Sequence, residues 1–451
     1  MDLIPIIGLE IHAELATATK MWCGCKNDPD EKRPNWNVCP VCLAHPGTLP
    51  VPNREAIRHV LRVGLAVGGR LADFTEFDRK NYFYPDIPKG YQISQYEYPL
   101  VAGGSLAGVA LTRIHLEEDT ARSQHAEDAD HSLVDFNRAG VPLMELVTEP
   151  VIENAKQAGD FARELQLLLR YLGVAEANME KGELRVEANI SLGTREKFGT
   201  KVEVKNLNSF RAVEKAINHE LERQRALLAS GGQVVQETRG WDDVAGVTFS
   251  QRQKESSHDY RYFPDPDIPK FKLSELAEFK NLDQTLPELP WQKRERYRAL
   301  GFLQSQDVEQ LVGDFELALF FDQTSAELKD PALIKAAANI ILNDIAGKRK
   351  NDPAWLPAAE TFVKVIKLNL PMPQMRSSIL TGKIVEVLSD DALGGIVDQV
   401  IAANPNVVAD YRGGKQSALQ FLVGQGMKES KGSANPAVLA KLFKAALDAQ
   451  S

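Results

Sequence analysis

The sequence predicts an α+β fold, with a mixed sheet in the first 290 residues and helices in the remainder. Residues 1–20 alternate apolar and polar side chains, as a strand with one buried face does. Further strand-like runs alternate with segments in which apolar residues recur at helical spacing. Beyond the proline-rich stretches at 264–269 and 286–290, only helical patterns continue.

The first strand carries two kinds of side chain. Ile7, Leu9 and Ile11 share one face, which leaves Glu10 and His12 together on the other. Further strands are expected at 111–116, 184–190 and 202–204, each with one polar face.

Two helices are predicted between these strands, and each ends at a glycine. The first is marked by Phe161, Leu165, Leu168, Leu169 and Leu172 before Gly173, and the second by Val213, Ile217 and Leu221 before Gly231. Asn404, Pro405, Gly413 and Gly414 interrupt the later helical pattern. We therefore predict domains at 1–290, 291–400 and 401–451.

The charge balance excludes a highly basic nucleic-acid coat protein, because 62 acidic residues face 53 basic ones. Residues 401–451 nevertheless carry a net charge of +3, against −12 for the rest. The sequence has no run of 18 apolar residues and no basic segment ahead of an apolar one at its start. We expect a cytoplasmic protein without a membrane span.

The four cysteines lie in two close pairs. Cys23 and Cys25 are separated by thirteen residues from Cys39 and Cys42, a spacing that lets two tight turns close around a tetrahedral ion. The alternative is four reduced cysteines in a loop. We predict a structural Zn²⁺ in a zinc-ribbon-like loop at 23–42, since four thiolates leave no open position for catalysis.

Acidic residues gather near the strands, and partly buried carboxylates need a cation. Glu10 and His12, residues 117–119, and Glu145 together offer hard oxygen ligands and an imidazole, which suit Mg²⁺ or Mn²⁺. A satisfied polar pair at a sheet edge is the alternative. Basic and aromatic residues also mix at 78–85 and 258–264, but neither a phosphate-binding glycine loop nor a nucleophilic hydrolase centre is present in the sequence.

Together these segments resemble the B subunit of the bacterial aspartyl/glutamyl-tRNA(Asn/Gln) amidotransferase, almost end to end. The resemblance includes Ile-Gly-Leu-Glu-Ile-His at 7–12 and Cys-Pro-Val-Cys-Leu at 39–43. It continues at 78–86, 91–95, 114–119, 135–138, 187–191, 205–210 and 259–267, and in the tail at 414–415, 421–425, 427–428, 431–432 and 434–436.

The resemblance implies a ligase of protein biosynthesis that amidates Glu on tRNA(Gln), or Asp on tRNA(Asn), while the amino acid is still esterified. Its cradle-shaped, kinase-like domain would use ATP and Mg²⁺ to phosphorylate the side-chain carboxylate. Ammonia from a separate amidase, the A subunit, would then displace phosphate, and a small C subunit would complete the heterotrimer.

The resemblance also assigns residues. Glu10, His12, Glu118 and Glu145 would form the magnesium site, with Glu117 possible in place of Glu118. Lys80, Lys205 and Asn206 would contact phosphate or the acceptor, and Asn189 and Glu203 share the polar strand faces. In the tail, Lys415, Lys428 and Lys431 would contact tRNA phosphates.

One departure concerns Thr120-Ala121-Arg122, where many relatives have Ala-Gly-Lys, so the local loop is expected to differ. Two rival hypotheses are a non-enzymatic RNA-binding protein and a free-standing ATP-dependent amino-acid ligase. Magnesium-dependent ATP turnover with mischarged tRNA distinguishes all three.

Overall fold

The structure is a computed structural model that describes residues 3–125, 130–194, 196–253, 260–368, 370–382, 390–415, 417–430, 434 and 436–449. It divides into two compact units, Met1–Lys293 and Arg294–Ser451.

The first unit is built on a mixed sheet, which has ten strands in the described residues. Nine run in the order β15-β14-β13-β12-β1-β11-β8-β6-β2, and β7 pairs with β8. The central strand β1 is antiparallel to β11 and β12, whereas β13 and β14 are parallel. The strands are β1 (Ile4–Glu14), β2 (Arg70–Leu71), β6 (Val101–Ala102), β7 (Ser105–Leu106), β8 (Val109–Glu118), β11 (Pro142–Thr148), β12 (Leu184–Gly193), β13 (Val202–Leu207), β14 (Glu237–Asp242) and β15 (Val247–Gln253).

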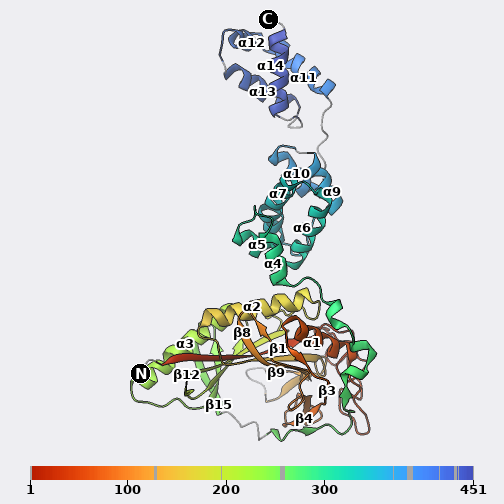
Figure 1. Cartoon of the computed structure of the whole chain (residues 1–451), viewed down its shortest axis with the longest axis vertical. Helices are drawn as coiled ribbons and strands as arrows, with labels where there is room; N and C mark the ends of the chain where they lie inside the picture. The colour runs from red at the N-terminus through yellow and green to blue at the C-terminus, as the bar shows by residue number, and fades with distance from the viewer. Residues whose placement is uncertain are drawn as a thin grey trace. The chain divides into compact units, whose positions relative to one another are not determined.

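Helices α1 (Arg54–Ala66), α2 (Ala155–Tyr171) and α3 (Phe210–Ala229) accompany this sheet, and α2 and α3 lie along one face of it (Figure 1). Ile7, Leu9 and Ile11 of β1 are at most 1% exposed and share a core with the apolar faces of all three helices. The predicted alternation in the first strand is therefore confirmed. The opposite face of β1 is left to Glu10 and His12.

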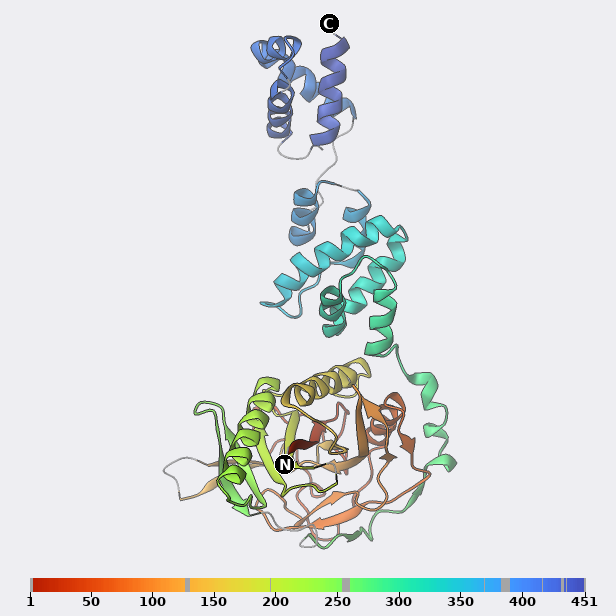
Figure 2. The ribbon, with the colours of Figure 1, turned by 60° about the vertical axis from the view of Figure 1, so that its left-hand side comes forward.

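Shorter strands lie on the side of the sheet away from α2 and α3, where Figures 1 and 2 place β4. They are β3 (Phe74–Thr75), β4 (Asp78–Asn81), β5 (Tyr91–Ser94), β9 (Arg122–His125), β10 (Ser132–Asp135), β16 (Phe263–Pro264) and β17 (Phe271–Lys272). β16, β4 and β5 form a small antiparallel sheet. Three 3-10 turns follow, at Leu273–Glu275, Ala277–Phe279 and Leu282–Thr285.

The second unit contains only helical elements in its described residues, as the sequence predicts. They are α4 (Pro290–Arg298, whose first residues belong to the first unit), α5 (Ser305–Gly313), α6 (Phe315–Leu328), α7 (Pro331–Ile340), a π-helical turn (Ile341–Ile345), α8 (Ala346–Arg349), α9 (Ala359–Lys367), α10 (Met372–Thr381), α11 (Asp390–Ala403), α12 (Pro405–Arg412), α13 (Ser417–Glu429) and α14 (Pro436–Ala449).

The last four helices have a core of their own. Val397 and Val400 of α11 pack in one apolar cluster with Leu422 of α13 and Phe443 of α14. The expected boundary at residue 401 therefore falls inside α11, which contributes to this core.

The α+β class, the large mixed sheet and the helical C-terminal region are confirmed, whereas the kinase-like and zinc-ribbon-like descriptions stay predictions. No helix in the described parts of the chain combines the length and apolar character needed to cross a bilayer.

Candidate active site on the polar face of the sheet

Strand register brings polar side chains from neighbouring strands into one row. His12 on β1 lies opposite Glu145 on β11, and Glu145 lies opposite His115 on β8. Glu145 Oε2 is 3.4 Å from Nε2 of His12 and 3.4 Å from Nε2 of His115. Glu117 Oε1 approaches His12 Nε2 to 3.6 Å. One carboxylate thus bridges two imidazoles.

A second group lies on the other side of β1. Glu10 pairs with Glu187 of β12, and ligand atoms of Glu10, Glu187 and Glu203 lie within 4.8 Å of one another. Lys205 Nζ lies 2.8 Å from Glu187 Oε2 and 3.9 Å from Glu203 Oε2. Glu10 is shared, because Glu10, His12 and Glu145 form another such group.

These groups perturb one another strongly because they are largely buried. Burial alone would lower the pKa of His12, but the nearby carboxylates, Glu145 foremost, outweigh it and raise that pKa to about 9. Burial and the charges of Glu145 and Glu187 raise the pKa of Glu10. Burial opposes ionisation of Glu145, yet His115 and His12 hold its pKa well below the usual value. Such mutual perturbation is typical of functional sites.

Lys80 on β4 faces the same cluster. Burial disfavours its charge, but Glu117 and Glu145 keep its pKa well above the ordinary value. Its Nζ lies 5.3 Å from the ring centroid of Tyr260 and 6.0 Å from that of Tyr82. A cation is therefore held between carboxylates and aromatic rings.

Glu118 does not join this cluster. Its carboxylate contacts Lys89 Nζ at 2.7 Å and accepts a hydrogen bond from the backbone N–H of Ile93 at 2.9 Å. Since neighbouring residues of a strand point to opposite faces, only one of the pair can face His12. That residue is Glu117, which is the alternative that the sequence left open.

Asn206 occupies an irregular position on β13. The β12–β13 register shifts between Val186 and Ala188, and Asn206 has a φ of 65°, in the left-handed region. Asparagine tolerates this region better than most residues, and bulges re-aim neighbouring side chains. Asn206 is exposed beside Lys205, and the Asn189 Oδ1 on β12 is buried without a hydrogen-bond partner among the described residues.

The four cysteines converge. The Sγ atoms of Cys23, Cys25, Cys39 and Cys42 all lie within 4.8 Å of one another, with Cys42 at 4.0 Å from Cys25 and 3.8 Å from Cys39. Tetrahedral Zn–S bonds of about 2.3 Å would separate the sulfurs by just under 4 Å. A hydrogen bond from Cys23 is the main cause that lowers the pKa of Cys42 to about 5. The cluster fits a metal ion.

The remaining predicted residues lie elsewhere. Lys415 is exposed and pairs with Asp410 at 2.9 Å, and Lys428 lies in the last turn of α13. Lys431 falls outside the described residues. In the departing loop, Arg122 bonds Asp30 at 3.0 Å.

Sequence reasoning did not identify His115, and it named Glu187 only as part of a polar strand face. Arg113, His115 and Glu117 alternate along β8, so the strand period alone would have placed His115 beside Glu117. Only the pairing of β8 with β11 brings that row to Glu145.

Buried ionisable groups that converge on one sheet face, joined to a helical C-terminal region, define the class of multidomain enzymes. The particular family follows from comparison with known proteins. Residues 5–277 match the family model described as "GatB/GatE catalytic domain", and residues 358–447 match "GatB domain". The chain belongs to this family, the B subunits of tRNA-dependent amidotransferases, which confirms the predicted resemblance.

Relatives match over nearly their whole length. The B subunit of the aspartyl/glutamyl-tRNA(Asn/Gln) amidotransferase of Moorella thermoacetica is 41% identical, over 98% of this chain and 99% of the relative. Its counterpart in Persephonella marina is 41% identical over 98% and 99%. The B subunit of the chloroplastic/mitochondrial glutamyl-tRNA(Gln) amidotransferase of Oryza sativa subsp. japonica is 41% identical over 99% and 88%.

Proposed function

We propose that this chain is the part of a glutamine-dependent tRNA amidotransferase that activates the side-chain carboxylate of Glu-tRNA(Gln), Asp-tRNA(Asn) or both. The relatives' names describe a ligase-type enzyme acting on these tRNAs in translation. The observation that carries the proposal is the convergence of Glu10, His12 and Glu145 on one sheet face.

The donor set of this face fits Mg²⁺. Carboxylate oxygens dominate it, one imidazole joins them, and the buried Oδ1 of Asn189 offers another oxygen. We assign Glu10, His12, Glu145 and Glu117 to the ion, with Glu117 in place of Glu118. When bound, Mg²⁺ would offset the negative charge of ATP phosphates.

The proposed chemistry has two balanced steps. First, an oxygen of the side-chain carboxylate attacks the γ-phosphorus of ATP, the bond to the β–γ bridging oxygen breaks, and ADP leaves. Second, ammonia attacks the carbonyl carbon of the acyl phosphate. The carbon–oxygen bond breaks, phosphate leaves with the electron pair, and the nitrogen loses a proton.

The lysines have distinct tasks under this proposal. Lys80 faces Glu117 and would orient the substrate carboxylate or a phosphate oxygen, because it stays charged at neutral pH. Lys205 lies across the sheet, and its ion pair with Glu187 would be exchanged for phosphate contact. Asn206, Asn189 and Glu203 would position the nucleotide beside it. Phosphoryl transfer depends chiefly on such positioning and charge stabilisation.

The relatives are named as one lettered component of an amidotransferase, which supports further chains in the complex. We propose that an amidase, the A subunit, releases ammonia from glutamine and that a small C subunit completes the same heterotrimer. Mischarged tRNA would contact Lys415, Lys428 and Lys431. The four cysteines would hold one structural Zn²⁺, which suits the reducing cytoplasm, where thiols do not pair.

The test is ADP release by the reconstituted heterotrimer with Glu-tRNA(Gln) and Mg²⁺. Glu10→Gln keeps the shape and removes one charge, so it should abolish ADP release while glutamine hydrolysis by the amidase survives. Glu153→Gln is the matched control, since Glu153 is exposed ahead of α2. Wild-type ADP release by the Glu10→Gln complex would overturn the proposal.

The same assay addresses the rivals. A non-enzymatic RNA-binding protein would bind mischarged tRNA without any ADP release. A free-standing ligase would turn over ATP with free glutamate or aspartate as the acceptor. ADP release only in the presence of mischarged tRNA supports the proposed function against both.

A further inference from the structure

Strand β14 places successive side chains on opposite faces of the sheet. On the polar face, the Oγ1 of Thr238 donates a hydrogen bond of 2.7 Å to Oε2 of Glu203. Thr238 is only 2% exposed, and Glu203 is one of the three carboxylates in the group with Glu10 and Glu187. A buried hydrogen bond to a charged oxygen fixes the orientation of the carboxylate.

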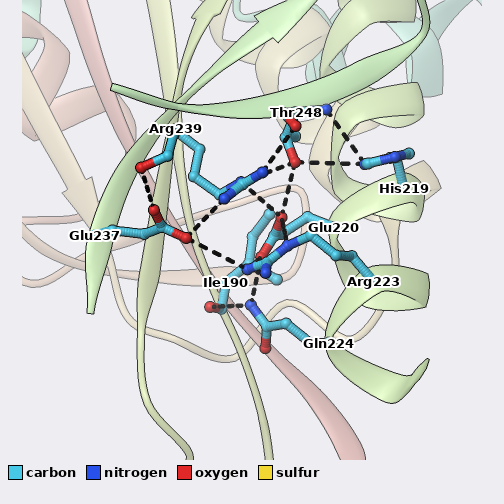
Figure 3. Close-up of polar contacts among 9 residues, drawn as sticks. Ile190, His219, Glu220, Arg223, Gln224, Glu237, Arg239 and Thr248 are labelled. Carbon is cyan, nitrogen blue, oxygen red and sulfur yellow. Dashed lines mark hydrogen bonds and ion pairs between the residues drawn. The ribbon is translucent and has the colours of Figure 1, made fainter. Parts of the chain in front are cut away.

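The next residue, Arg239, faces α3 instead (Figure 3). Its Nε and Nη2 donate to Oγ1 and the carbonyl oxygen of Thr248 on β15, at 3.0 and 2.8 Å. Its Nη1 donates to Glu237 Oε1 at 2.7 Å, and Nε lies 3.6 Å from Glu220 Oε2 on α3. Arg239 therefore ties β14 to both β15 and α3.

Glu220 is the centre of this arrangement and is fully buried. Its carboxylate accepts hydrogen bonds from Arg223 at 2.7 Å, Gln224 at 2.9 Å and Thr248 at 3.1 Å. Gln224 also donates to the carbonyl oxygen of Ile190 on β12 at 3.2 Å. A satisfied buried network of this kind favours one arrangement of the elements it joins. Here those elements flank β13, which carries Glu203.

The backbone alone gives β14 a weak register. Its parallel pairing with β13 covers Glu203↔Thr238, Val204↔Arg239 and Lys205↔Gly240, and its pairing with β15 shifts between Thr238 and Arg239. Such a short ladder beside an irregularity specifies register poorly. The side chains around Arg239 supply what the ladder does not.

We propose that Thr238 is a positioning residue that holds the Glu203 carboxylate in its group with Glu10 and Glu187, and that the Arg239–Glu220 network fixes β14 for this task from the opposite face. The inference rests on the proposed function, in which this face binds a divalent cation.

The first test compares Thr238→Val with Thr238→Ser in the reconstituted complex. Valine keeps the shape and loses the donor, whereas serine retains the hydroxyl. Thr112→Val is the matched control, because Thr112 Oγ1 donates to Glu149 at the same 2.7 Å at an exposed place on β8. The readouts are calorimetric Mn²⁺ affinity without ATP, the Mg²⁺ dependence of ADP release, and the thermal midpoint.

We expect Thr238→Val to weaken Mn²⁺ binding and raise the Mg²⁺ requirement by about tenfold, the size of a lost hydrogen bond to a charged group. Saturating Mg²⁺ should restore most of the rate. Thr238→Ser and Thr112→Val should stay within about twofold of wild type. Equal Mn²⁺ affinity in Thr238→Val and wild type would overturn the inference.

The second test concerns the network. Arg239→Lys keeps the charge but loses the forked donors, so it should also weaken Mn²⁺ binding. If Arg239 acts through Thr238, the double variant Thr238→Val/Arg239→Lys should bind Mn²⁺ no more weakly than Thr238→Val alone. Additive losses would overturn the link between them. A wild-type complex that binds no Mn²⁺ would instead overturn the proposed function itself.

Discussion

His12 and Glu145 lie directly opposite each other on β1 and β11, with His12 Nε2 3.4 Å from Glu145 Oε2. The same carboxylate oxygen lies 3.4 Å from His115 on the far side of β11. Because little water reaches these groups, the charge of Glu145 keeps the proton on His12, and the imidazoles in turn keep Glu145 ionised.

This pairing predicts a pH-dependent contribution of His12 to stability. The pKa of His12 rises from 6.5 to about 9 on folding, so the stabilisation is complete below pH 6.5 and is lost as the pH rises through about 9. Without divalent ions, wild type should exceed His12→Gln in free energy of unfolding at pH 6 by up to about 3 kcal/mol. Urea unfolding at pH 6 and pH 10 checks this, and a pH-independent difference would contradict it.

Neighbouring carboxylates on β8 allow a second prediction. Glu117→Gln removes a charge that faces both His12 and Lys80, so ADP release with mischarged tRNA should fall at least about a hundredfold. Glu118→Gln disturbs the ion pair with Lys89 instead and should retain most of that activity. Side-by-side ADP-release assays decide between them. The reverse ranking would return the ligand role to Glu118.

The strand period explains how much of this site the sequence predicts. Alternation along β1 places Glu10 and His12 on the face opposite Ile7 and Leu9, and burial confirms it. Choosing between Glu117 and Glu118 requires the register of β8 on β11, which no local pattern encodes. The same is true of Thr238, whose role depends on a parallel pairing between strands separated by α3.

The helical half was predicted as a class and less well in its divisions. Asn404 and Pro405 mark a true break between α11 and α12. That break lies inside one packed group of helices, because Val397 and Val400 before it share a core with Phe443 after it. Turn residues identify ends of helices, whereas domain edges depend on tertiary contacts.

The cysteine cluster predicts a local effect of metal removal. Cys39→Ser, or chelation of Zn²⁺, should loosen residues 20–45, because few backbone hydrogen bonds there join regular strands. Hydrogen exchange should rise in that segment, while ADP release changes by less than about threefold, since all four ligands are thiols and none is open for chemistry. Zinc analysis of wild-type protein purified without chelator provides the control. Absence of zinc there would contradict the assignment.

The last prediction concerns the C-terminal helices. Because α11 packs with α13 and α14, a truncation should end at Gly382 and not near residue 402, which would expose the apolar face of α11. The truncated complex should still release glutamine-derived ammonia and bind ATP, but it should bind mischarged tRNA more weakly. Transamidation at limiting tRNA should therefore fall.

Two lysines provide the finer version of this experiment. The surface pair between Lys415 and Asp410 is worth only about 0–1 kcal/mol, so a tRNA phosphate can replace Asp410 as the partner. Lys415→Gln and Lys428→Gln should each weaken tRNA binding and each lower the salt dependence of log Kd by about one unit, with no preferred base sequence affected. Lys156→Gln is the matched control, because Lys156 is an exposed lysine paired with Asp160 on α2. Binding isotherms at several salt concentrations measure all three, and salt slopes equal to wild type in the Lys415 and Lys428 variants would show that these helices do not contact tRNA phosphates.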